Sequence, residues 1–343
     1  MTQVTSETLY RKYRPMTFDD VLGQDEVISI LQNSIKQGSI SHSYLFSGTR
    51  GTGKTSIARI FAKELGTTDQ DIYEIDAASN RGIGEIRELR AGVDTRPFNS
   101  NYKVYIIDEV HMLTKEAFNA LLKTLEEPPS HVIFILATTE KHKILDTIIS
   151  RCQVFDFNRP NKGLLVELVN RTCKSEGRSI DQESAGFIAS LGDGSFRDTL
   201  SHLQKIFAYV PDDITFDKVS EVMNISDGNL VMSFVKALNE GDKDQVFALY
   251  HQTKDLSINR EVFIQDVLNT VRNVLLTKYS KAHTEHTLLE SGEETVAAYQ
   301  EMTNITSKHL QDMIKVVSQF STTQNPEALF EVYLFNLFQE AHD

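Results

Sequence analysis

The chain has 343 residues, too many for one ordinary hydrophobic core, so two or three domains are expected. Apolar residues at 40% and charged residues at 24% are typical of a globular protein, and the lack of a bilayer-length apolar run or a secretory signal predicts a cytoplasmic protein without a membrane segment. The net charge of −13 argues at first against a nucleic-acid partner, and two cysteines, Cys152 and Cys173, are too few for a disulfide framework or a four-cysteine zinc site.

The negative charge is unevenly distributed along the chain. Residues 1–160 hold 19 Lys and Arg against 21 Asp and Glu, whereas residues 161–343 hold 16 against 27. The C-terminal part is therefore acidic, while the N-terminal part is near neutral and can still present a local basic strip to DNA.

A basic and aromatic lead-in, residues 8–22, precedes a helix that the apolar spacing predicts over residues 24–38. Such an arm is most often packed onto its own domain, but it can also cover an adenine base, and both interpretations stay open here. The lead-in residues that would then contact the nucleotide are Tyr10, Arg14 and Val21.

Residues 48–55 fill the phosphate-binding pattern G-x-x-x-x-G-K-[ST], with an apolar strand over residues 44–47 before them and a helix over residues 56–63 after them. The glycines allow a tight turn whose N–H groups point at the phosphates of ATP, and Lys54 adds a positive charge there. The Thr55 hydroxyl is a candidate ligand for a magnesium ion. The predicted nucleotide-binding residues of this loop are Gly48, Thr49, Arg50, Gly51, Thr52, Gly53, Lys54, Thr55 and Ser56.

Another apolar strand, predicted over residues 104–107, ends in the carboxylates Asp108 and Glu109. In a P-loop protein such a pair is placed for chemistry: Asp108 would hold the magnesium ion, and Glu109 would act as the general base on the attacking water. A solvated strand end is the alternative. The strand predicted over residues 132–137 delivers Thr138, whose hydroxyl can hydrogen-bond the γ-phosphate or the water.

Strands and helices alternate along the first 160 residues, with a further short strand at residues 72–75 and a helix at residues 83–89. Alternation implies a parallel, doubly wound α/β sheet whose ligands bind at the carboxyl ends of its strands. The phosphate-binding loop, the acidic pair and Thr138 all fall at such ends, although each was identified independently of that rule.

These motifs together resemble the AAA+ clamp-loader ATPases, most closely the gamma/tau family of bacterial DNA polymerase III in its short, gamma-like form. The likeness covers nearly all of residues 9–160. Besides the phosphate-binding loop it rests on these strings: Tyr13-Arg14-Pro15, Gly23-Gln24, Glu74-Ile75-Asp76-Ala77-Ala78-Ser79, residues 107–113, residues 119–129, Ala137-Thr138-Thr139 and Ser150-Arg151-Cys152.

The resemblance implies roles that the spacing alone does not assign. Thr138 looks like sensor 1, and Arg151 looks like an arginine finger that reaches the γ-phosphate bound by a neighbouring subunit. Hydrolysis would then depend on assembly, because the transition-state charge stays uncompensated in a lone chain. A surface arginine at the start of a strand is the plain alternative for Arg151. Arg197 lies in a string similar to the sensor 2 motif, near the start of a helix.

One departure from the family is plain. Its members usually carry a four-cysteine zinc module between the helix after the phosphate-binding loop and the next strand, where this chain has only residues 66–71. The zinc role is therefore not carried over. Loss of the module in a particular lineage, such as a viral one, and its deliberate removal both remain open.

The expected architecture is an α/β P-loop AAA+ domain over residues 1–160, a small helical lid over residues 161–225 and an all-α collar over residues 226–343. Apolar residues recur in the collar at helical spacing. Examples are Phe263/Val267/Val271/Val274 and Leu310/Met313/Ile314/Val317. The resemblance implies that the collar closes five subunits into a ring, whereas an ordinary helix bundle without a partner fits the pattern equally well.

The resemblance further implies an ATP-hydrolysing motor of a sliding-clamp loader, with ATP and Mg²⁺ bound and no zinc expected. Its partners would be delta- and delta-prime-like loader subunits, the clamp and primer–template DNA, in a hetero-pentamer or a homo-oligomer. Sequence-independent DNA phosphate contacts would fall on Arg81, Arg87 and Lys123. No polymerase site is expected, so a DNA-directed DNA polymerase label would come only from membership of the polymerase III holoenzyme.

Three other functions remain as alternatives. Another AAA+ motor, such as a Holliday-junction helicase or a remodeller, would form a hexamer and explains the string over residues 121–129 poorly. A scaffold-type loader subunit would have lost the lysine of the phosphate-binding loop, whereas Lys54 and Thr55 are intact. A metabolic P-loop kinase gives no reason for Arg151 and Arg197.

Overall fold

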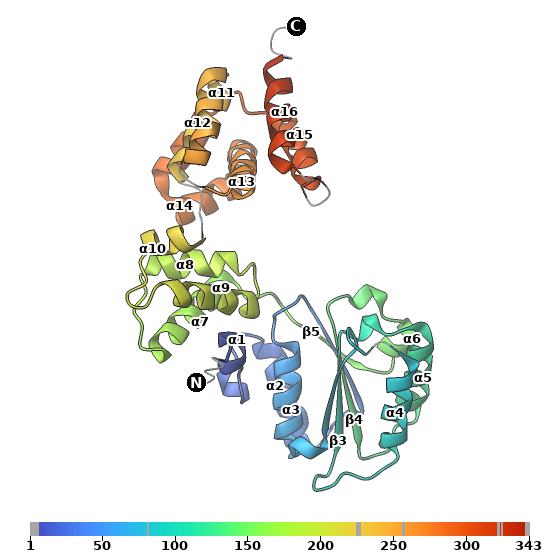
Figure 1. The fold of residues 1–343 in the computed structure, drawn as a ribbon. Helices are drawn as coiled ribbons and strands as arrows, with labels where there is room; N and C mark the ends of the chain where they lie inside the picture. The colour runs from blue at the N-terminus through green and yellow to red at the C-terminus, as the bar shows by residue number, and fades with distance from the viewer. Residues whose placement is uncertain are drawn as a thin grey trace, which may run out of the picture. The chain divides into compact units, whose positions relative to one another are not determined.

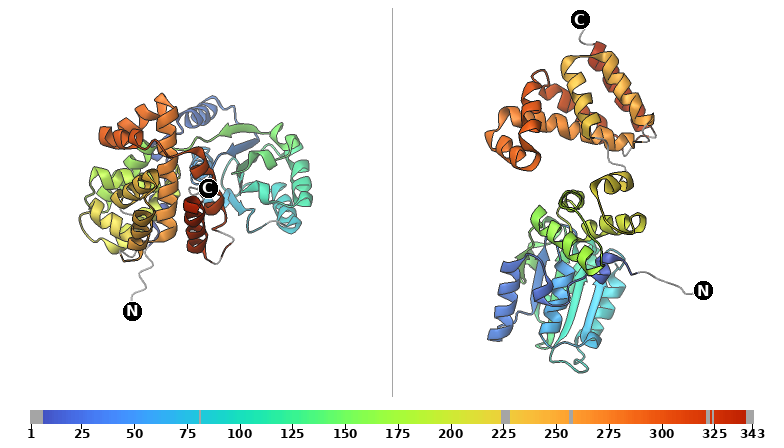
Figure 2. Two further views of the ribbon diagram at one scale, coloured as in Figure 1. Left: turned by 90° about the horizontal axis from the view of Figure 1, so that it is seen from above. Right: turned by 90° about the vertical axis from the view of Figure 1, so that its left-hand side faces the viewer.

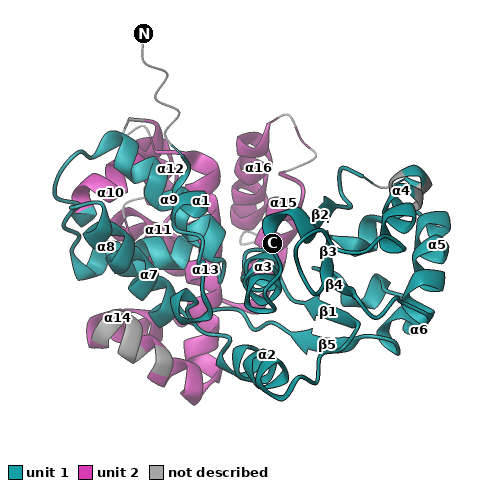
Figure 3. Cartoon of the chain, turned by 90° about the horizontal axis from the view of Figure 1, so that it is seen from below, with its two compact units in different colours: residues 1–216 teal, residues 217–343 magenta. Residues whose placement is uncertain are grey.

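The computed structural model describes residues 7–80, 82–223, 228–255, 258–320, 323 and 325–339. The chain divides into two compact units, Met1–Phe216 and Asp217–Asp343, which have different colours in Figure 3. All the strands found within the described ranges belong to the first unit, and the described elements of the second unit are helices.

A five-stranded parallel sheet with the order β2-β3-β4-β1-β5 forms the centre of the first unit. Its strands are β1 (Ser43–Ser47), β2 (Ile72–Asp76), β3 (Lys103–Asp108), β4 (Val132–Thr138) and β5 (Gln153–Asp156). Three strands, β1, β3 and β4, are buried almost throughout. Helices cover both faces of the sheet, so an apolar side chain is favourable at nearly every position of these strands. The predicted doubly wound parallel sheet is confirmed.

Helices lie on both faces of this sheet (Figure 1). On one face α2 (Asp25–Gln37) and α3 (Lys54–Glu64) pack against a core that includes Tyr44, Phe46 and Phe61. On the other, α4 (Ile83–Val93), α5 (Lys115–Glu126) and α6 (Asp146–Ile149) enclose a second core around Phe134 and Leu121. The described connections include the short 3-10 helices η1 (Phe18–Asp20), η2 (Asp69–Asp71), η3 (Val110–Met112) and η4 (Lys141–Lys143).

A group of helices completes the first unit. It consists of α1 (Leu9–Lys12), α7 (Lys162–Ser175), α8 (Gln182–Leu191) and α9 (Phe196–Tyr209), with α1 packed on α9. The side chains of Asn161, Asp181 and Ser195 each accept a hydrogen bond from a backbone N–H three residues on, which satisfies a free donor and defines where α7, α8 and α9 begin. The cap at Ser195 places Arg197 in the first turn of α9.

The second unit is a helical bundle, coloured from yellow to red in Figure 2. Its helices are α10 (Phe216–Met223), α11 (Gly228–Glu240), α12 (Lys243–Asp255), α13 (Arg260–Tyr279), α14 (Lys281–Glu301), α15 (Ser307–Ser318) and α16 (Pro326–Gln339). α13 contacts α11, α12, α14, α15 and α16, and the predicted stripe from Phe263 to Val274 is fully buried along it. No helix within the described ranges of either unit combines the length and apolar character needed to cross a bilayer.

One residue of a predicted apolar stripe in this bundle is exposed. Met313 in α15 is fully buried, but half of the next residue, Ile314, is open to solvent. Successive residues of a helix point about 100° apart, so on a helix with one buried side only one of these two neighbours faces the core. The predicted apolar stripe therefore includes one residue, Ile314, that does not face the core.

The short connection from α3 to β2 is anchored by a buried carboxylate. Asp71 is fully buried and accepts hydrogen bonds from the N–H groups of Phe98 at 2.7 Å and Asn99 at 3.1 Å, in the loop before β3. Burial alone would raise the pKa of Asp71, but these donors and the Ser100 hydroxyl outweigh it and hold the pKa below its ordinary value. These hydrogen bonds attach residues 66–71 to the loop that leads into β3.

We expect Asp71→Asn to lower the free energy of unfolding at neutral pH by about 1–3 kcal/mol, because the amide group leaves a buried N–H donor without its acceptor. Since the folded-state pKa lies below the unfolded-state value, this stabilisation is present above about pH 4 and is lost as the pH falls through the folded-state pKa. Urea denaturation of the whole chain at neutral and acidic pH measures both effects. Asp69→Asn, at a carboxylate that is 84% exposed, is the matched control, and equal losses in the two variants would contradict the role given to Asp71.

Candidate active site

The loop of residues 48–55 joins β1 to α3 at the carboxyl edge of the sheet. Gly51 and Gly53 have φ values of 75° and 101°, which residues with a side chain rarely adopt. Gly51 also lies against the start of α9: a Cβ atom there would be 2.0 Å from Ser195 Oγ, and the Gly51 carbonyl accepts a hydrogen bond from Phe196 N at 3.0 Å. The loop therefore needs glycine at this point, both for its turn and for its contact with α9.

The side chain of Lys54 is buried inside this loop, with the residue 5% exposed. Its Nζ donates hydrogen bonds to the carbonyl oxygens of Gly48 and Thr49, both at 2.8 Å. Burial lowers the pKa of Lys54, and the nearby carboxylates of Glu109 and Asp108 act against that shift. The ammonium group is thus held at the mouth of the loop, where phosphate oxygens can replace the two carbonyls as acceptors.

The predicted magnesium ligands lie in direct contact. Thr55 Oγ1 donates a hydrogen bond to Asp108 Oδ2 at 2.6 Å, and Glu109 N donates to Asp108 Oδ1 at 2.9 Å. A hydroxyl and a carboxylate at this spacing are the oxygen ligands that Mg²⁺ prefers, so the residues fit that ion. Among the described residues, no group of three His, Cys, Asp or Glu side chains gathers that could hold a metal, and the expectation that the chain binds no zinc stays a prediction.

Glu109 and Thr138 lie beside that pair and share a histidine neighbour. Glu109 has left-handed backbone angles of 49° and 43°, and its Oε2 accepts a hydrogen bond from Thr139 Oγ1 at 2.9 Å. Thr138 is fully buried, and its Oγ1 lies 2.9 Å from Nδ1 of His111. His111 belongs to the family-like string of residues 107–113, but the sequence alone assigns it no role. The signal that marks it is a polar residue two positions after Glu109, inside an otherwise apolar run.

Arg197 reaches from α9 toward the lead-in. Its guanidinium lies 4.8 Å from the centroid of the Tyr10 ring, a cation–π contact. Because Gly51 touches the same turn of α9, the structure brings Arg197 and Tyr10 to the side of the phosphate-binding loop. The lead-in is therefore packed onto its own unit, as the first of the two interpretations has it.

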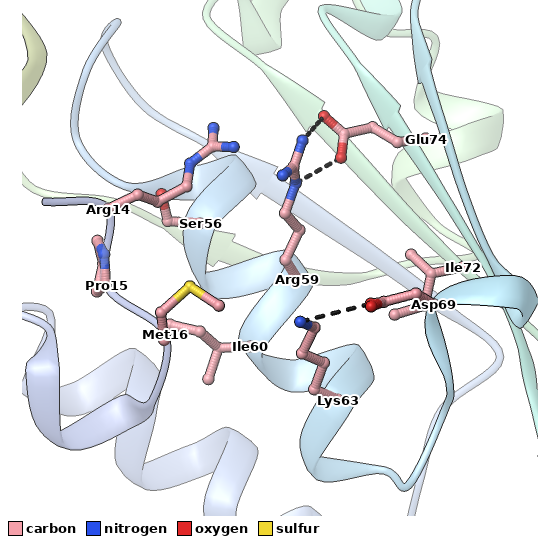
Figure 4. A pocket seen from close by; sticks show the side chains of 10 residues that line it. All are labelled: Arg14, Pro15, Met16, Ser56, Arg59, Ile60, Lys63, Asp69, Ile72 and Glu74. Atoms are coloured by element: carbon pink, nitrogen blue, oxygen red, sulfur yellow. Dashed lines mark hydrogen bonds and ion pairs between the residues drawn. The ribbon is translucent and has the colours of Figure 1, made fainter. Parts of the chain in front are cut away.

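A pocket of about 240 Å³ lies between the lead-in and α3 (Figure 4). Two predicted nucleotide contacts, Arg14 and Ser56, line this pocket. Its other lining residues are Pro15, Met16, Arg59, Ile60, Lys63, Asp69, Ile72 and Glu74. Burial lowers the pKa of Arg14, and the guanidinium of Arg59 lowers it further. Val21, the third predicted contact of the lead-in, packs instead against the core beside α2 and α3.

Arg151 makes its contacts away from these residues. Its Nη1 donates to the Thr147 carbonyl at 2.6 Å, and its Nη2 donates to Glu126 Oε1 at 2.7 Å. The side chain is about one-third exposed, so its guanidinium is fixed at the surface of the first unit between α5 and α6. This placement is compatible with a residue that acts on a second molecule.

The three predicted DNA contacts are only partly described. Arg81 lies outside the described residues, and so does the side chain of Arg87, although its backbone is part of α4. Lys123 is exposed on α5 and lines a surface hollow of about 410 Å³ together with Arg90 and Asp94. DNA contact by these residues stays a prediction.

Comparisons with known proteins place the chain in a family. The family model described as DNA polymerase III, delta subunit, matches residues 23–82 and 66–161, and the model described as DNA polymerase III subunits gamma and tau domain III matches residues 214–342. The DNA polymerase III subunit tau of Bacillus subtilis is 38% identical over 98% of this chain and 64% of its own length. The DNA polymerase III subunit tau of Escherichia coli is 36% identical over 80% of this chain and 46% of its own length.

A solved structure shares the fold of the chain. The Thermotoga maritima RuvB Holliday junction branch migration motor superposes with a TM-score of 0.54 over 73% of this chain and 87% of its own, at 22% identity. Together with the parallel sheet and the loop after β1, this likeness defines the class: a P-loop protein with the AAA+ fold, as predicted.

The chain belongs to the gamma/tau family of DNA polymerase III subunits. The DNA polymerase III subunit gamma of Buchnera aphidicola subsp. Schizaphis graminum is 34% identical over 79% of this chain and 81% of its own length. The predicted family is thereby confirmed. The chain spans about half to two-thirds of the length of the tau relatives from Escherichia coli and Bacillus subtilis.

We expect Lys54→Ala to weaken the binding of a fluorescent ATP analogue to the whole chain by about tenfold to 100-fold, because charge-assisted hydrogen bonds to the phosphates are lost. Fluorescence titration in the presence of magnesium measures the dissociation constant. The control is Lys36→Ala, which removes the same charge from an exposed position on α2 and should leave the dissociation constant unchanged. An unaltered affinity in Lys54→Ala would mean that the nucleotide binds elsewhere.

Proposed function

We propose that the chain is an ATP-hydrolysing motor subunit of a replicative clamp loader, which opens a sliding clamp and loads it onto primed DNA within the DNA polymerase III holoenzyme. The observation that carries the proposal is the direct contact of Thr55 with Asp108 beneath a complete phosphate-binding loop, with Glu109 and Thr138 beside it. Membership of the gamma/tau family supports the choice of this motor among AAA+ proteins.

ATP binding rests on the loop and on Lys54. The N–H groups of residues 51–55 at the start of α3 would surround the β- and γ-phosphates, where the positive end of the helix favours negative charge. Lys54 Nζ would exchange the carbonyls of Gly48 and Thr49 for phosphate oxygens. A magnesium ion held by Thr55 and Asp108 would neutralise charge on the phosphates.

Hydrolysis would use the two residues at the ends of β3 and β4. Glu109 would take a proton from the attacking water, and Thr138 would orient that water or the γ-phosphate by a hydrogen bond. In this structure Glu109 accepts hydrogen bonds from Thr139. Its carboxylate must rotate, or keep these bonds while it accepts another, in order to take a proton from the water. Such a rearrangement offers a point at which hydrolysis can be controlled.

The remaining negative charge on the transition state would be stabilised by a residue of a neighbouring subunit. Arg151 makes its contacts with Glu126 and Thr147, at the surface, so we assign it to the nucleotide of a neighbouring subunit. Arg197 would contact a phosphate of the nucleotide bound to its own chain. Because α9 contacts Gly51, nucleotide binding would also change the position of the helical lid.

The assembly proposed has three domains in each subunit: residues 1–160 for nucleotide binding, 161–225 for the lid and 226–343 for the collar that joins the ring. Partners would be delta- and delta-prime-like subunits, the sliding clamp and primer–template DNA, with Arg81, Arg87 and Lys123 as phosphate contacts. Any polymerase activity would belong to other subunits of the holoenzyme. The likeness to RuvB concerns the fold alone and does not favour a branch-migration motor.

We expect Arg151→Ala to reduce the ATP turnover that primed DNA and clamp stimulate in the assembled loader by at least about 100-fold, because an arginine finger stabilises the transition-state charge. ATP binding by the isolated chain should not change. Steady-state phosphate release from the complex of this chain with its cognate loader subunits measures the turnover.

Arg171→Ala is the matched control for that experiment, since it removes an exposed arginine from α7. It should leave stimulated turnover within about twofold, as expected for a surface substitution. Full activity of the Arg151 variant, or turnover that is indifferent to DNA and clamp, would reject the clamp-loader proposal in favour of a self-contained P-loop enzyme.

A further inference from the structure

His111 is a buried imidazole at the centre of the candidate active site, and the mechanism above does not use it. It lies in η3, two residues after Glu109, and its side chain is 5% exposed. Nδ1 lies 2.9 Å from Thr138 Oγ1 and 3.5 Å from Glu109 Oε2, while Nε2 lies 3.3 Å from Glu140 Oε1. The same nitrogen thus faces both residues that would act on the water.

We propose that His111 is a positioning residue that ties the hydroxyl of Thr138 to the carboxylate of Glu109 through Nδ1. The inference rests on the proposed ATPase function. It adds that the two groups do not respond to the γ-phosphate independently: a shift of Thr138 toward the phosphate changes what Nδ1 can offer to Glu109.

The hydrogen-bonding capacity of Thr138 shows why the ring matters. Its hydroxyl can donate one hydrogen, and its oxygen already accepts from Glu140 N at 3.0 Å. When the ring carries its proton on Nε2, facing the Glu140 carboxylate, Nδ1 is an acceptor and the Thr138 hydroxyl donates to it. When Nδ1 carries the proton, Nδ1 donates to Thr138 and the hydroxyl hydrogen is free for phosphate or water. The ring therefore decides to what Thr138 can donate.

Glu109 faces the same nitrogen, which can donate to its carboxylate only when Nδ1 carries the proton. Besides His111, its Oε2 is contacted by the hydroxyl and the N–H of Thr139 at 2.9 and 3.3 Å. Removal of the ring would leave the carboxylate held by Thr139 alone and Thr138, which is fully buried, without its side-chain partner. Buried groups that lose a partner in this way are expected to reorient.

The test compares His111→Asn with His111→Gln in the full chain assembled with its cognate loader subunits, clamp and primed DNA. The amide group of Asn is the same number of bonds from Cα as Nδ1, whereas that of Gln matches Nε2. We expect Gln to lower kcat for ATP about tenfold, as for the loss of one productive hydrogen bond, and Asn to keep kcat within about threefold of the parent. The KM for ATP, and the affinity of the isolated chain for a fluorescent ATP analogue, should stay within about twofold in both.

A purely structural role predicts a different pattern. Equal losses for Asn and Gln, or a loss in KM rather than kcat, would overturn the inference. Thr138→Val supplies a second measurement: combined with His111→Gln it should cost no more than the larger single loss, because the two variants break the same contact. A loss equal to the product of the single losses would also overturn it. His42→Asn, at an exposed histidine before β1, is the control.

Failure of the proposed function is recognised separately. Lys54→Ala and Arg151→Ala are measured in the same assembly. If both retain full stimulated turnover, the clamp-loader ATPase proposal fails and the role of His111 fails with it. If both collapse while the His111 variants behave like the parent, only the role of His111 is rejected.

Discussion

The hydrogen bond between Thr55 and Asp108 depends on the register of strands that are not neighbours. β4 lies between β1 and β3 and pairs Leu136 with both Leu45 and Ile107. Asp108, the next residue of β3, therefore emerges level with the end of β1, from which the phosphate-binding loop starts. A slip of one residue in either pairing would turn Asp108 to the opposite face of the sheet and separate it from Thr55. The geometry of the candidate active site therefore depends on the register of the sheet.

A second constraint joins the loop to the helices that follow the sheet. The near-contact of Gly51 with Ser195, and the hydrogen bond from Phe196 to the Gly51 carbonyl, make the first turn of α9 part of the wall of the loop. The loop and that turn are in close contact at this point, because no Cβ atom fits between them. The placement of Arg197 over Tyr10 extends the same connection to the lead-in. A change of the loop on nucleotide binding would therefore act on the first turn of α9.

Local patterns predicted the strands, the phosphate-binding loop and the pairing of Thr55 with Asp108, but not every contact between distant segments. Residues 48–55 and the acidic end of β3 were identified because the residues of each motif are contiguous, and the rule for parallel sheets then predicted that they lie at the same edge. His111 was missed because its partners Thr138 and Glu140 come from a different strand end, 27 and more residues away. The apolar spacing over residues 310–317 correctly indicated a helix, but it did not say which of Met313 and Ile314 faces the core.

The contact of Arg151 with Glu126 bears on why one chain would be an incomplete enzyme. Both side chains are partly exposed, and such ion pairs contribute only about 0–1 kcal/mol, so the carboxylate can be exchanged for a phosphate of higher charge at little cost. The bond to the Thr147 carbonyl engages the other terminal nitrogen and keeps the guanidinium oriented meanwhile. An arginine that is oriented but weakly paired is suited to act on a second subunit, because it needs neither a large rearrangement nor the loss of a strong bond when that subunit arrives.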